Sequence, residues 1–377
     1  MKKIIIISLF LFVAMMNFTH VEAKTKTCKI GAFRYKYKEE KQGVWITKIT
    51  PLSSKGIATL NIPSKLSGKK VVKLGASGDR VTDFDDFDRD TNLFGVMDPD
   101  EPRIDLLPPN IHKKVEKIKT IKIPSTVKIL TYNCFNHIQD GKNINIPAGV
   151  TENVVSPFTR VKWNKIEVSA QNKKFKVKNG CLLSKNGTKL YGFVQKKKKI
   201  VIPSTVKKII NWGDYNGCST LVIPKSVNKI EKDACSTYKP MTVKVAKGNK
   251  RYAVKYGSVY SKVSGRLVLG YVKYGVLKIP EEVTLIDGHG FLGENLRKII
   301  FPAGVKKIRN FFCLKPIHEG ILTCVFYCQN PPELIEPLVW GDPIIYVPKN
   351  CKGKYMERWK ELLEDPFVKV TFIELKS

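Results

Sequence analysis

Short runs of alternating apolar and polar residues recur along most of the chain, and each run ends in proline. Two of them are Ile121-Lys122-Ile123-Pro124 and Leu277-Lys278-Ile279-Pro280. Alternation over three or four residues predicts a short strand with one buried face. Proline has no N–H to donate to a neighbouring strand, so it ends each strand at a turn. A valine three residues after the proline and an isoleucine soon after it extend the inward-facing set: Val127, Val150, Val206, Val227, Val283 and Val305, with Ile129, Ile209, Ile230, Ile286 and Ile308.

These runs form a repeat with two nested periods. The prolines that end the strands are Pro63, Pro124, Pro147, Pro203, Pro224, Pro280, Pro302 and Pro348, and from Pro124 onward their spacings are 23, 56, 21, 56, 22 and 46. Residues 168–190 also match residues 245–267 at an offset of 77, which pairs Asn172 with Asn249 and Gly180 with Gly257. One short unit cannot bury its apolar face alone, whereas stacked units can, so the pattern predicts a solenoid.

The long spacings contain two insertions, at about residues 166–194 and 243–272. Asn179-Gly180 and Asn186-Gly187 are turn dipeptides flanked by apolar residues, and Tyr256-Gly257 and Ser264-Gly265 occupy the matching places in the second copy. Such dipeptides between apolar runs predict β-hairpins.

The domain boundaries follow from these patterns. Tyr355, Trp359, Leu362 and Leu363 have the spacing of an amphipathic helix, which we expect to cover the open end of the stack. We expect a signal peptide at 1–23, an N-terminal extension at 24–42, the solenoid at 43–350 with an atypical acidic segment at 79–117, and a C-terminal cap at 351–377.

The first 23 residues are typical of a secretory signal peptide. Lys2 and Lys3 precede a largely apolar run from Ile4 to Met16, and Ala23 is a small residue at the place where a signal peptidase cleaves. The run is shorter than the about 20 residues that cross a bilayer, which disfavours the alternative of an uncleaved membrane anchor. We therefore expect a secreted or surface-associated protein with no stable membrane span after cleavage.

The nine cysteines are odd in number, which disfavours a fully paired disulfide scaffold. Cys134, Cys235 and Cys313 each stand five residues after a repeat isoleucine, where Phe291 stands in another repeat. A place that accepts phenylalanine or cysteine is a buried apolar position, so we expect free thiols there. A disulfide that joins Cys324 to Cys328 or Cys351 remains an alternative.

The repeat strings resemble a known family. "IPSTVKIL", "IPSTVKKI", "IPKSVNKIEKDAC" and "IPEEVTLIDGHGF" are similar to the Ile-Pro-x-x-Val-x-x-Ile-x-x-x-Ala-Phe core of BspA-like, or type-5, leucine-rich repeat proteins. The resemblance covers about residues 43–363 and is broken near 79–117. It implies a β-rich leucine-rich repeat solenoid of short parallel strands stacked in a right-handed superhelix, with β-hairpin insertions and a C-terminal capping helix. It also implies a bacterial, or mucosal protozoan, surface or secreted protein associated with adhesion, without shared catalytic residues.

The sequence contains no arrangement typical of an active site. The five histidines form no HExxH motif and lie in no GxSxG frame, and an SxxK pattern recurs in repeat register, which marks it as part of a turn. We therefore expect a protein that is not an enzyme and needs no cofactor.

The acidic segment holds the only metal candidate. Asp86, Asp88, Asp90 and Asn92 have the spacing of a calcium loop, but Thr91 replaces its turn glycine and Met97 its bidentate glutamate. We favour a solvated acidic loop and no metal; a weak calcium site and an intramolecular partner for the lysine-rich face are the alternatives.

Charge and exposed aromatics indicate two kinds of partner. Lys and Arg total 66 against 33 Asp and Glu, a formal net charge of +33, which favours polyanions. The excess is almost entirely lysine, and phosphate readers rely on arginine, so we expect no nucleic acid as the physiological partner. Aligned basic positions predict a possible polyanion-binding ridge at Lys173, Lys174, Lys196, Lys197, Lys198, Lys199, Lys207, Lys208, Lys306 and Lys307. The candidate protein-binding aromatics in the insertions are Tyr191, Phe193, Tyr260, Tyr271 and Tyr274.

The sequence thus predicts a non-catalytic secreted or cell-surface binding protein, adhesin-like, whose partner is a host matrix or cell-surface protein. The alternative is a structural protein held by its basic surface on anionic wall polymers or glycans.

Overall fold

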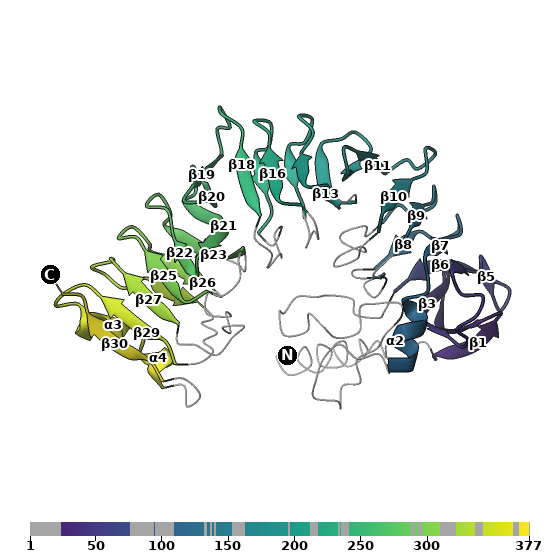
Figure 1. Cartoon of the computed structure of the whole chain (residues 1–377), viewed down its shortest axis with the longest axis horizontal. Helices are drawn as coiled ribbons and strands as arrows, with labels where there is room; N and C mark the ends of the chain where they lie inside the picture. Colours follow the sequence, from purple (N-terminus) through teal and green to yellow (C-terminus); the bar gives the residue numbers. More distant parts are fainter. Residues whose placement is uncertain are drawn as a thin grey trace, which may run out of the picture.

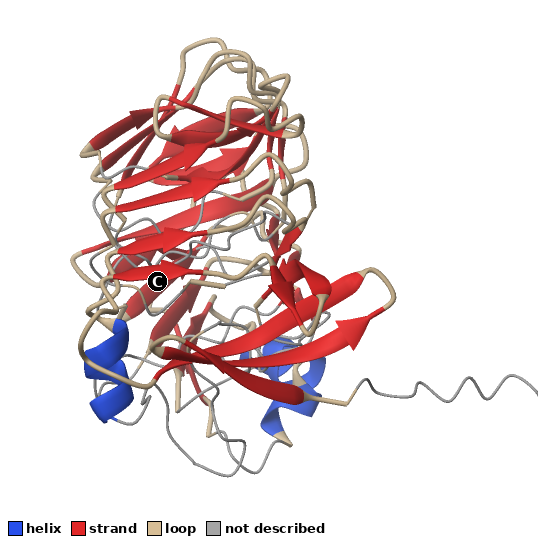
Figure 2. Ribbon diagram, turned by 90° about the vertical axis from the view of Figure 1, so that its right-hand side faces the viewer, coloured by secondary structure: helices blue, strands red, loops and turns tan. Residues whose placement is uncertain are grey.

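The computed structural model describes residues 24–75, 94, 109–131, 134–135, 138, 141–152, 163–194, 197–211, 218–232, 234, 241–287, 291–292, 296–309, 322–335, 342–364 and 369–376. Within them the chain consists mostly of short strands that follow one another along an arc (Figure 1). At right angles to that view, the same strands lie stacked above one another (Figure 2). The expected β-rich solenoid is confirmed.

Each turn of the solenoid places one strand in a first row, before the proline turn. Neighbours in this row pair in parallel within three groups, for example Ile121 with Ile144. The first group is β4 (Thr59–Asn61), β7 (Thr120–Lys122), β9 (Asn143–Ile146) and β10 (Lys165–Val168), and the second is β14 (Lys199–Val201), β16 (Thr220–Ile223) and β18 (Thr242–Val245). The third is β22 (Val276–Lys278), β25 (Lys298–Phe301), β27 (Thr323–Phe326), β29 (Ile344–Val347) and β30 (Thr371–Glu374).

A second row of strands follows the proline turns. Its members also pair in parallel, as Ile209 does with Ile230. They are β8 (Ile129–Leu130), β13 (Lys189–Phe193), β15 (Lys208–Ile209), β17 (Lys229–Ile230), β21 (Arg266–Lys273), β23 (Leu285–Asp287), β26 (Lys307–Arg309) and β28 (Glu333–Ile335). The short strand β24 (Phe291–Leu292) pairs with the end of β21.

The core lies between the two rows. All six valines that follow the prolines are buried, as are Ile209, Ile230, Ile286 and Ile308, so the predicted inward-facing set is confirmed at these positions. Ile129 differs, because β8 pairs Leu130 with the buried Leu74 of the neighbouring strand and so turns Leu130 inward instead.

The hairpins lie inside turns of the solenoid. In the first copy, β10 is a first-row strand, β11 (Phe175–Lys178) and β12 (Cys181–Ser184) form the antiparallel hairpin, and β13 returns to the second row. In the second copy, β18, β19 (Tyr252–Lys255), β20 (Ser258–Ser261) and β21 repeat this order. Residues 166–194 and 243–272 therefore each hold most of a solenoid turn together with its hairpin, and β10 and β18 are first-row strands that no proline follows directly.

A buried asparagine takes the place of the proline turn in each of these two turns. The Asn172 amide donates to the carbonyl oxygens of Pro147 (2.9 Å) and Val150 (2.8 Å) in the preceding turn, and its oxygen accepts from two backbone N–H groups, those of Lys174 and Phe175. Asn249 repeats all four bonds. Cys328 lies in the same place one turn after Pro302, with its sulfur 3.2 Å from the Pro302 carbonyl oxygen. The side chain at this position ties one solenoid turn to the next.

The cysteines behave as apolar core residues. Cys134 is fully buried, and burial raises the pKa of its thiol well above the ordinary value. Cys324, Cys328 and Cys351 are buried free thiols, and none of the cysteines in the described ranges forms a disulfide. Cys235 and Cys313 lie outside the described residues.

Helices lie at the two ends of the described arc (Figure 1). At the C-terminal end, α3 (Lys352–Arg358) and α4 (Lys360–Leu363) bury Tyr355, Trp359 and Leu362, which confirms the predicted amphipathic helix. The helices do not end the stack, because the chain continues into β30, which pairs in parallel with β29. No helix in the described ranges is long and apolar enough to cross a membrane. The expected signal peptide, residues 1–23, lies outside these ranges.

The N-terminal end is closed by a sheet that differs from the repeats. Its order is β1 (Lys26–Ile30), β2 (Phe33–Glu40), β3 (Gly43–Pro51), β6 (Lys69–Leu74) and β5 (Lys65–Leu66), with β8 also paired to β6. The helix α2 (Pro109–Val115) packs against β3.

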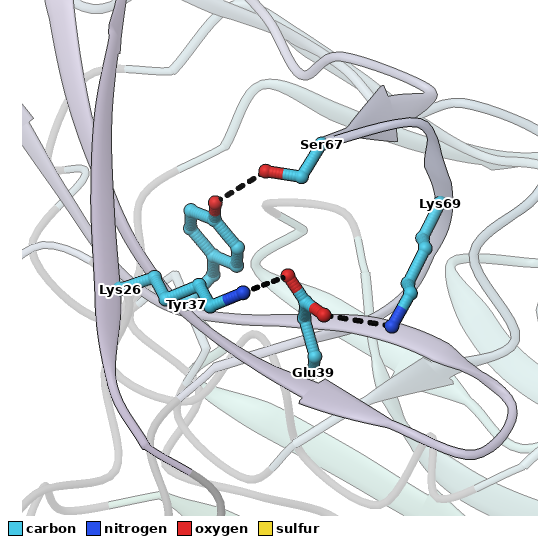
Figure 3. A network of polar contacts seen from close by, with 5 residues as sticks. All are labelled: Lys26, Tyr37, Glu39, Ser67 and Lys69. Atoms are coloured by element: carbon cyan, nitrogen blue, oxygen red, sulfur yellow. Dashed lines mark hydrogen bonds and ion pairs between the residues drawn. The ribbon is translucent and has the colours of Figure 1, made fainter.

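Glu39 joins three strands of this sheet (Figure 3). Its carboxylate accepts hydrogen bonds from Lys26 Nζ (2.6 Å) on β1 and Lys69 Nζ (2.7 Å) on β6. On the same part of the sheet, the Tyr37 hydroxyl lies 2.6 Å from Ser67 Oγ. The hydrogen bond from Lys26, followed by that from Lys69, lowers the pKa of Glu39 to about 2.

This network predicts a pH dependence of the first strand. Because the pKa of Glu39 is lowered by folding, its contacts stabilise the sheet above the ordinary glutamate value and are lost as the pH falls towards 2. We expect hydrogen-exchange protection of the β1 amides to fall across that range in the wild type. In Glu39→Gln that protection is expected to be low already at pH 6; full protection of the variant at pH 6 would contradict the assignment.

Candidate binding surface

The five candidate aromatics in the insertions lie in different environments. Phe193 and Tyr260 are buried in the core. Tyr191 is half-buried, its ring makes an edge contact with Phe175 (centroids 5.4 Å apart), and burial raises its pKa. Tyr271 is half-buried as well, and Tyr274 is 93% exposed. Only Tyr274 of this set presents a free ring.

A second exposed tyrosine, Tyr256, escaped prediction. It is 43% exposed and forms the hairpin turn between β19 and β20 with Gly257. The predicted Tyr256-Gly257 turn is confirmed, but the predicted set of aromatics does not contain Tyr256; Asn179 occupies the matching place in the first insertion.

The two exposed tyrosines lie at the same end of the second insertion. Val259 of β20 pairs with Leu269 of β21, so the start of β20 lies beside the end of β21. A Cβ atom on Gly257 would stand 2.5 Å from the Tyr271 ring, which shows how closely this turn approaches β21. Tyr274 follows three residues later, in the turn between β21 and β22.

Both tyrosines have left-handed backbone conformations, with φ of 52° at Tyr256 and 51° at Tyr274. Such values are uncommon for residues other than glycine and asparagine, and the left-handed region costs other residues roughly 1–2 kcal/mol. Asn179, at the place of Tyr256 in the first insertion, has a φ of 54°. The second insertion therefore carries backbone strain at its turns that asparagine would reduce.

Tyr256 is held in place by its neighbours. Its hydroxyl donates to Glu281 Oε1 (2.8 Å), and Lys278 Nζ lies 4.1 Å from its ring centroid. Lys255 pairs with Glu281 and Glu282, and hydrogen bonding from Lys255 is the main cause that lowers the pKa of Glu281 to about 2. The ring is thus oriented before any partner arrives.

Tyr274 has fewer contacts. Lys273 Nζ lies 5.3 Å from its ring centroid, a weak cation–π contact at an exposed site. The ring projects into solvent at the tip of a two-residue turn.

The corresponding end of the first insertion is basic. At the offset of 77, Lys197 matches Tyr274 and Lys196 matches Lys273. Lys197, Lys198 and Lys199 are exposed, whereas Lys196 lies outside the described residues. From β14 to β22 the first row advances three strands, and β18 and β22 belong to different sheets. We call Lys197–Lys199, Tyr256, Lys273, Tyr274 and Lys278 together the insert edge.

The remaining lysines of the expected ridge lie elsewhere. Lys173 and Lys174 are exposed and lie at the open end of the first hairpin, away from its Asn179-Gly180 turn. The backbone N–H of Lys185 donates to the Lys174 carbonyl oxygen at this end. Lys208 pairs with Glu231, and Lys307 with Glu333 (3.2 Å), while Lys207 and Lys306 are exposed on the second row. The lysines of the expected ridge therefore do not form one continuous surface. Some lie at either end of the first insertion, and others lie along the second row, where glutamates pair with two of them.

No group of three potential metal ligands occurs within the described residues. The calcium candidates Asp86, Asp88, Asp90 and Asn92 lie outside them.

Similarity to a known repeat family supports the repeat pattern. No curated protein matches the chain. Two solved structures are similar, each 14% identical: a leucine-rich repeat protein from Eubacterium ventriosum (TM-score 0.37, covering 93% of this chain and 85% of that one) and the pneumococcal vaccine antigen PcpA (TM-score 0.29, 93% and 99%). The sequence matches the BspA type leucine rich repeat region, in six copies, over residues 106–189 and 271–315. The protein therefore carries leucine-rich repeats of the BspA type.

Proposed function

We propose that the protein is a secreted or cell-surface binding protein, adhesin-like, and that its insert edge contacts an acidic surface of a host matrix or cell-surface protein. The fold supports this proposal because a solenoid offers extended surfaces for binding.

The exposure of Tyr274 carries the proposal. A tyrosine that is 93% exposed contributes little to packing, and at a φ of 51° it destabilises its own turn. Strained residues of this kind cluster at functional sites, where binding rather than stability favours them. Tyrosine is also a frequent hot-spot residue, because its ring supplies a large contact area at a small entropic cost.

The charge of the surroundings favours an acidic partner. Lys197, Lys198 and Lys199 make up one part of the insert edge, and Lys273 lies beside Tyr274. Lys278 lies beside Tyr256 and pairs with Glu281. Complementary charge speeds encounter, while the aromatic rings supply affinity that salt does not screen.

A second candidate is a structural role on anionic wall polymers. The exposed Lys207 and Lys306 and the net charge of +33 favour it. Attachment of this kind depends on charge alone and therefore weakens steeply as salt is added.

Retention of residues 24–377 on immobilised matrix proteins such as fibronectin, and on heparin and teichoic acid, distinguishes the two. We expect retention on a matrix protein that survives high salt. For Tyr274→Asn we expect affinity for that protein to fall tenfold or more, while the free energy of unfolding rises by up to about 1 kcal/mol because asparagine tolerates the left-handed turn.

The matched control is Tyr327→Asn, which removes another exposed tyrosine that lies outside the insert edge. This control should bind as the wild type does. Equal affinity of Tyr274→Asn and the wild type would exclude the insert edge, and loss of all retention at high salt would favour the wall-polymer role.

A further inference from the structure

A lysine-lined hollow lies at the N-terminal end of the solenoid, apart from the insert edge. Its volume is about 560 Å³, and its walls are Ser54, Lys113, Lys114, Glu116, Lys117 and Lys119. In Figure 1, α2 lies near the N-terminal end of the arc and β19–β22 lie well along it towards the C-terminal end. The hollow is therefore a separate surface.

The fold brings these residues together from two distant segments. The helix α2 packs against β3, so the residues of its last turn and of the turn beyond it face the loop that follows β3 and contains Ser54. Lys114 Nζ donates to the Leu52 carbonyl oxygen (3.2 Å) and ties the helix to that loop. This hydrogen bond holds the helix side of the hollow against the loop that follows β3.

The hollow holds more positive charge than is needed to stabilise the C-terminal end of α2. A cation near the C-terminal end of a helix is favourable, and Lys114 already occupies that place. Four lysine residues nonetheless line the hollow together with Glu116. Lys113 and Lys117 form no ion pair with any residue that the structure describes. Lys113 and Lys117 stand four residues apart beside the hollow, so their like charges repel one another unless an anion joins them.

We propose that this hollow binds a tetrahedral oxyanion, the sulfate or phosphate group, carried on a polymer of sugar or polyol units. Lysine acts on such groups as a point charge with three donors, and Ser54 adds a hydroxyl donor. Pockets that hold small molecules measure about 300–1,000 Å³, so the hollow has room for more than a single ion. This site would hold a polyanion at one end of the solenoid while the insert edge remains free for a protein.

The experiment is titration calorimetry on residues 24–377 at a fixed, near-physiological salt concentration. The three probes are a heparin-derived tetrasaccharide, a glycerol phosphate oligomer and inorganic phosphate. We expect one of the oligomers to bind with one-to-one stoichiometry and at least tenfold more tightly than inorganic phosphate. The oligomer that binds identifies the source of the oxyanion.

Two variants assign the binding to the hollow. Lys113→Ala combined with Lys117→Ala is expected to weaken the oligomer tenfold or more, and Ser54→Asp, which adds a negative charge in the hollow, is expected to do the same. The control is Lys225→Ala combined with Lys349→Ala, which removes the same charge from two other exposed lysines and should change the affinity less than twofold.

Equal losses in the paired-lysine variant and its control would overturn the proposal, because the binding would then reflect net charge alone. Binding of inorganic phosphate as tight as that of both oligomers would overturn its polymer part. Neither result depends on the insert edge, so this proposal and the proposed adhesin role succeed or fail separately.

Discussion

Replacing Asn249 with leucine is expected to lower the free energy of unfolding by about 3–5 kcal/mol. Asn249 is 2% exposed, and its amide group makes four hydrogen bonds to the backbone. Leucine has a similar volume but no polar atoms, so the carbonyl oxygens of Pro224 and Val227 and the N–H groups of Arg251 and Tyr252 lose their partner. Each buried polar group left unpaired costs about 1–3 kcal/mol. Urea unfolding followed by circular dichroism measures the change.

Asn249→Asp tests the same contacts in a graded way. Its carboxylate still accepts from the two N–H groups, but it also places a negative charge against the carbonyl oxygens of Pro224 and Val227. Burial and this repulsion should raise the pKa of the carboxyl in the folded chain. A group with a raised folded pKa stabilises most at low pH, so the deficit relative to the wild type should shrink as the pH falls.

Asn228→Leu is the matched control, since Asn228 is exposed and its backbone alone bonds to the preceding turn. Its effect should stay within about 0.5 kcal/mol. If Asn249→Leu lowers the free energy of unfolding no more than this control, water replaces the amide. Asn172→Leu in the first insertion provides an independent repeat of the test.

The solenoid could be predicted because its signals are local. A strand, a proline and a valine three residues later recur wherever a turn of the ordinary kind is built, and each such valine is buried. The strands β10, β18 and β27 lack the local repeat signal, because Asn172, Asn249 and Cys328, rather than a proline turn, follow them. The membership of β10 and β18 depends on parallel pairing with β9 and β16, which is a contact between turns that local patterns do not contain.

The binding surface could be predicted only in part. The sequence identified the aromatic insertions, but exposure depends on the face that each side chain takes in the folded sheet. Tyr260 points into the core from β20, whereas Tyr274 projects from a turn. The basic ridge likewise depended on which lysines have acidic neighbours: Lys208 has Glu231 on the adjacent strand, and Lys207 faces solvent.

In the two insertions, different residues serve stability and binding. Their buried asparagines make the same four bonds, so the backbone of each is held in the same way. Their exposed ends differ, with Asn179 and Lys197 in one copy and Tyr256 and Tyr274 in the other. Two chemically different surfaces therefore lie on one repeated scaffold.

Replacing Phe326 with alanine is expected to lower the free energy of unfolding by about 3–5 kcal/mol, chiefly by releasing the C-terminal helices. Phe326 is fully buried and lies stacked on Phe301, with ring centroids 4.0 Å apart. Its other neighbours are Trp359 (5.2 Å) and Tyr355 (5.7 Å), which anchor α3 and α4. Alanine leaves a cavity between the last repeats and the helices that cover them.

Limited proteolysis shows where that loss falls. We expect trypsin to cut Phe326→Ala first within residues 352–363, because the helices can detach while the earlier turns stay stacked. Met356→Ala is the matched control: Met356 lies on the exposed side of α3, and its loss should change stability by less than about 0.5 kcal/mol. Uniform cleavage along the whole chain of Phe326→Ala would contradict a local role, since it would mean that the C-terminal core sets the stability of every turn.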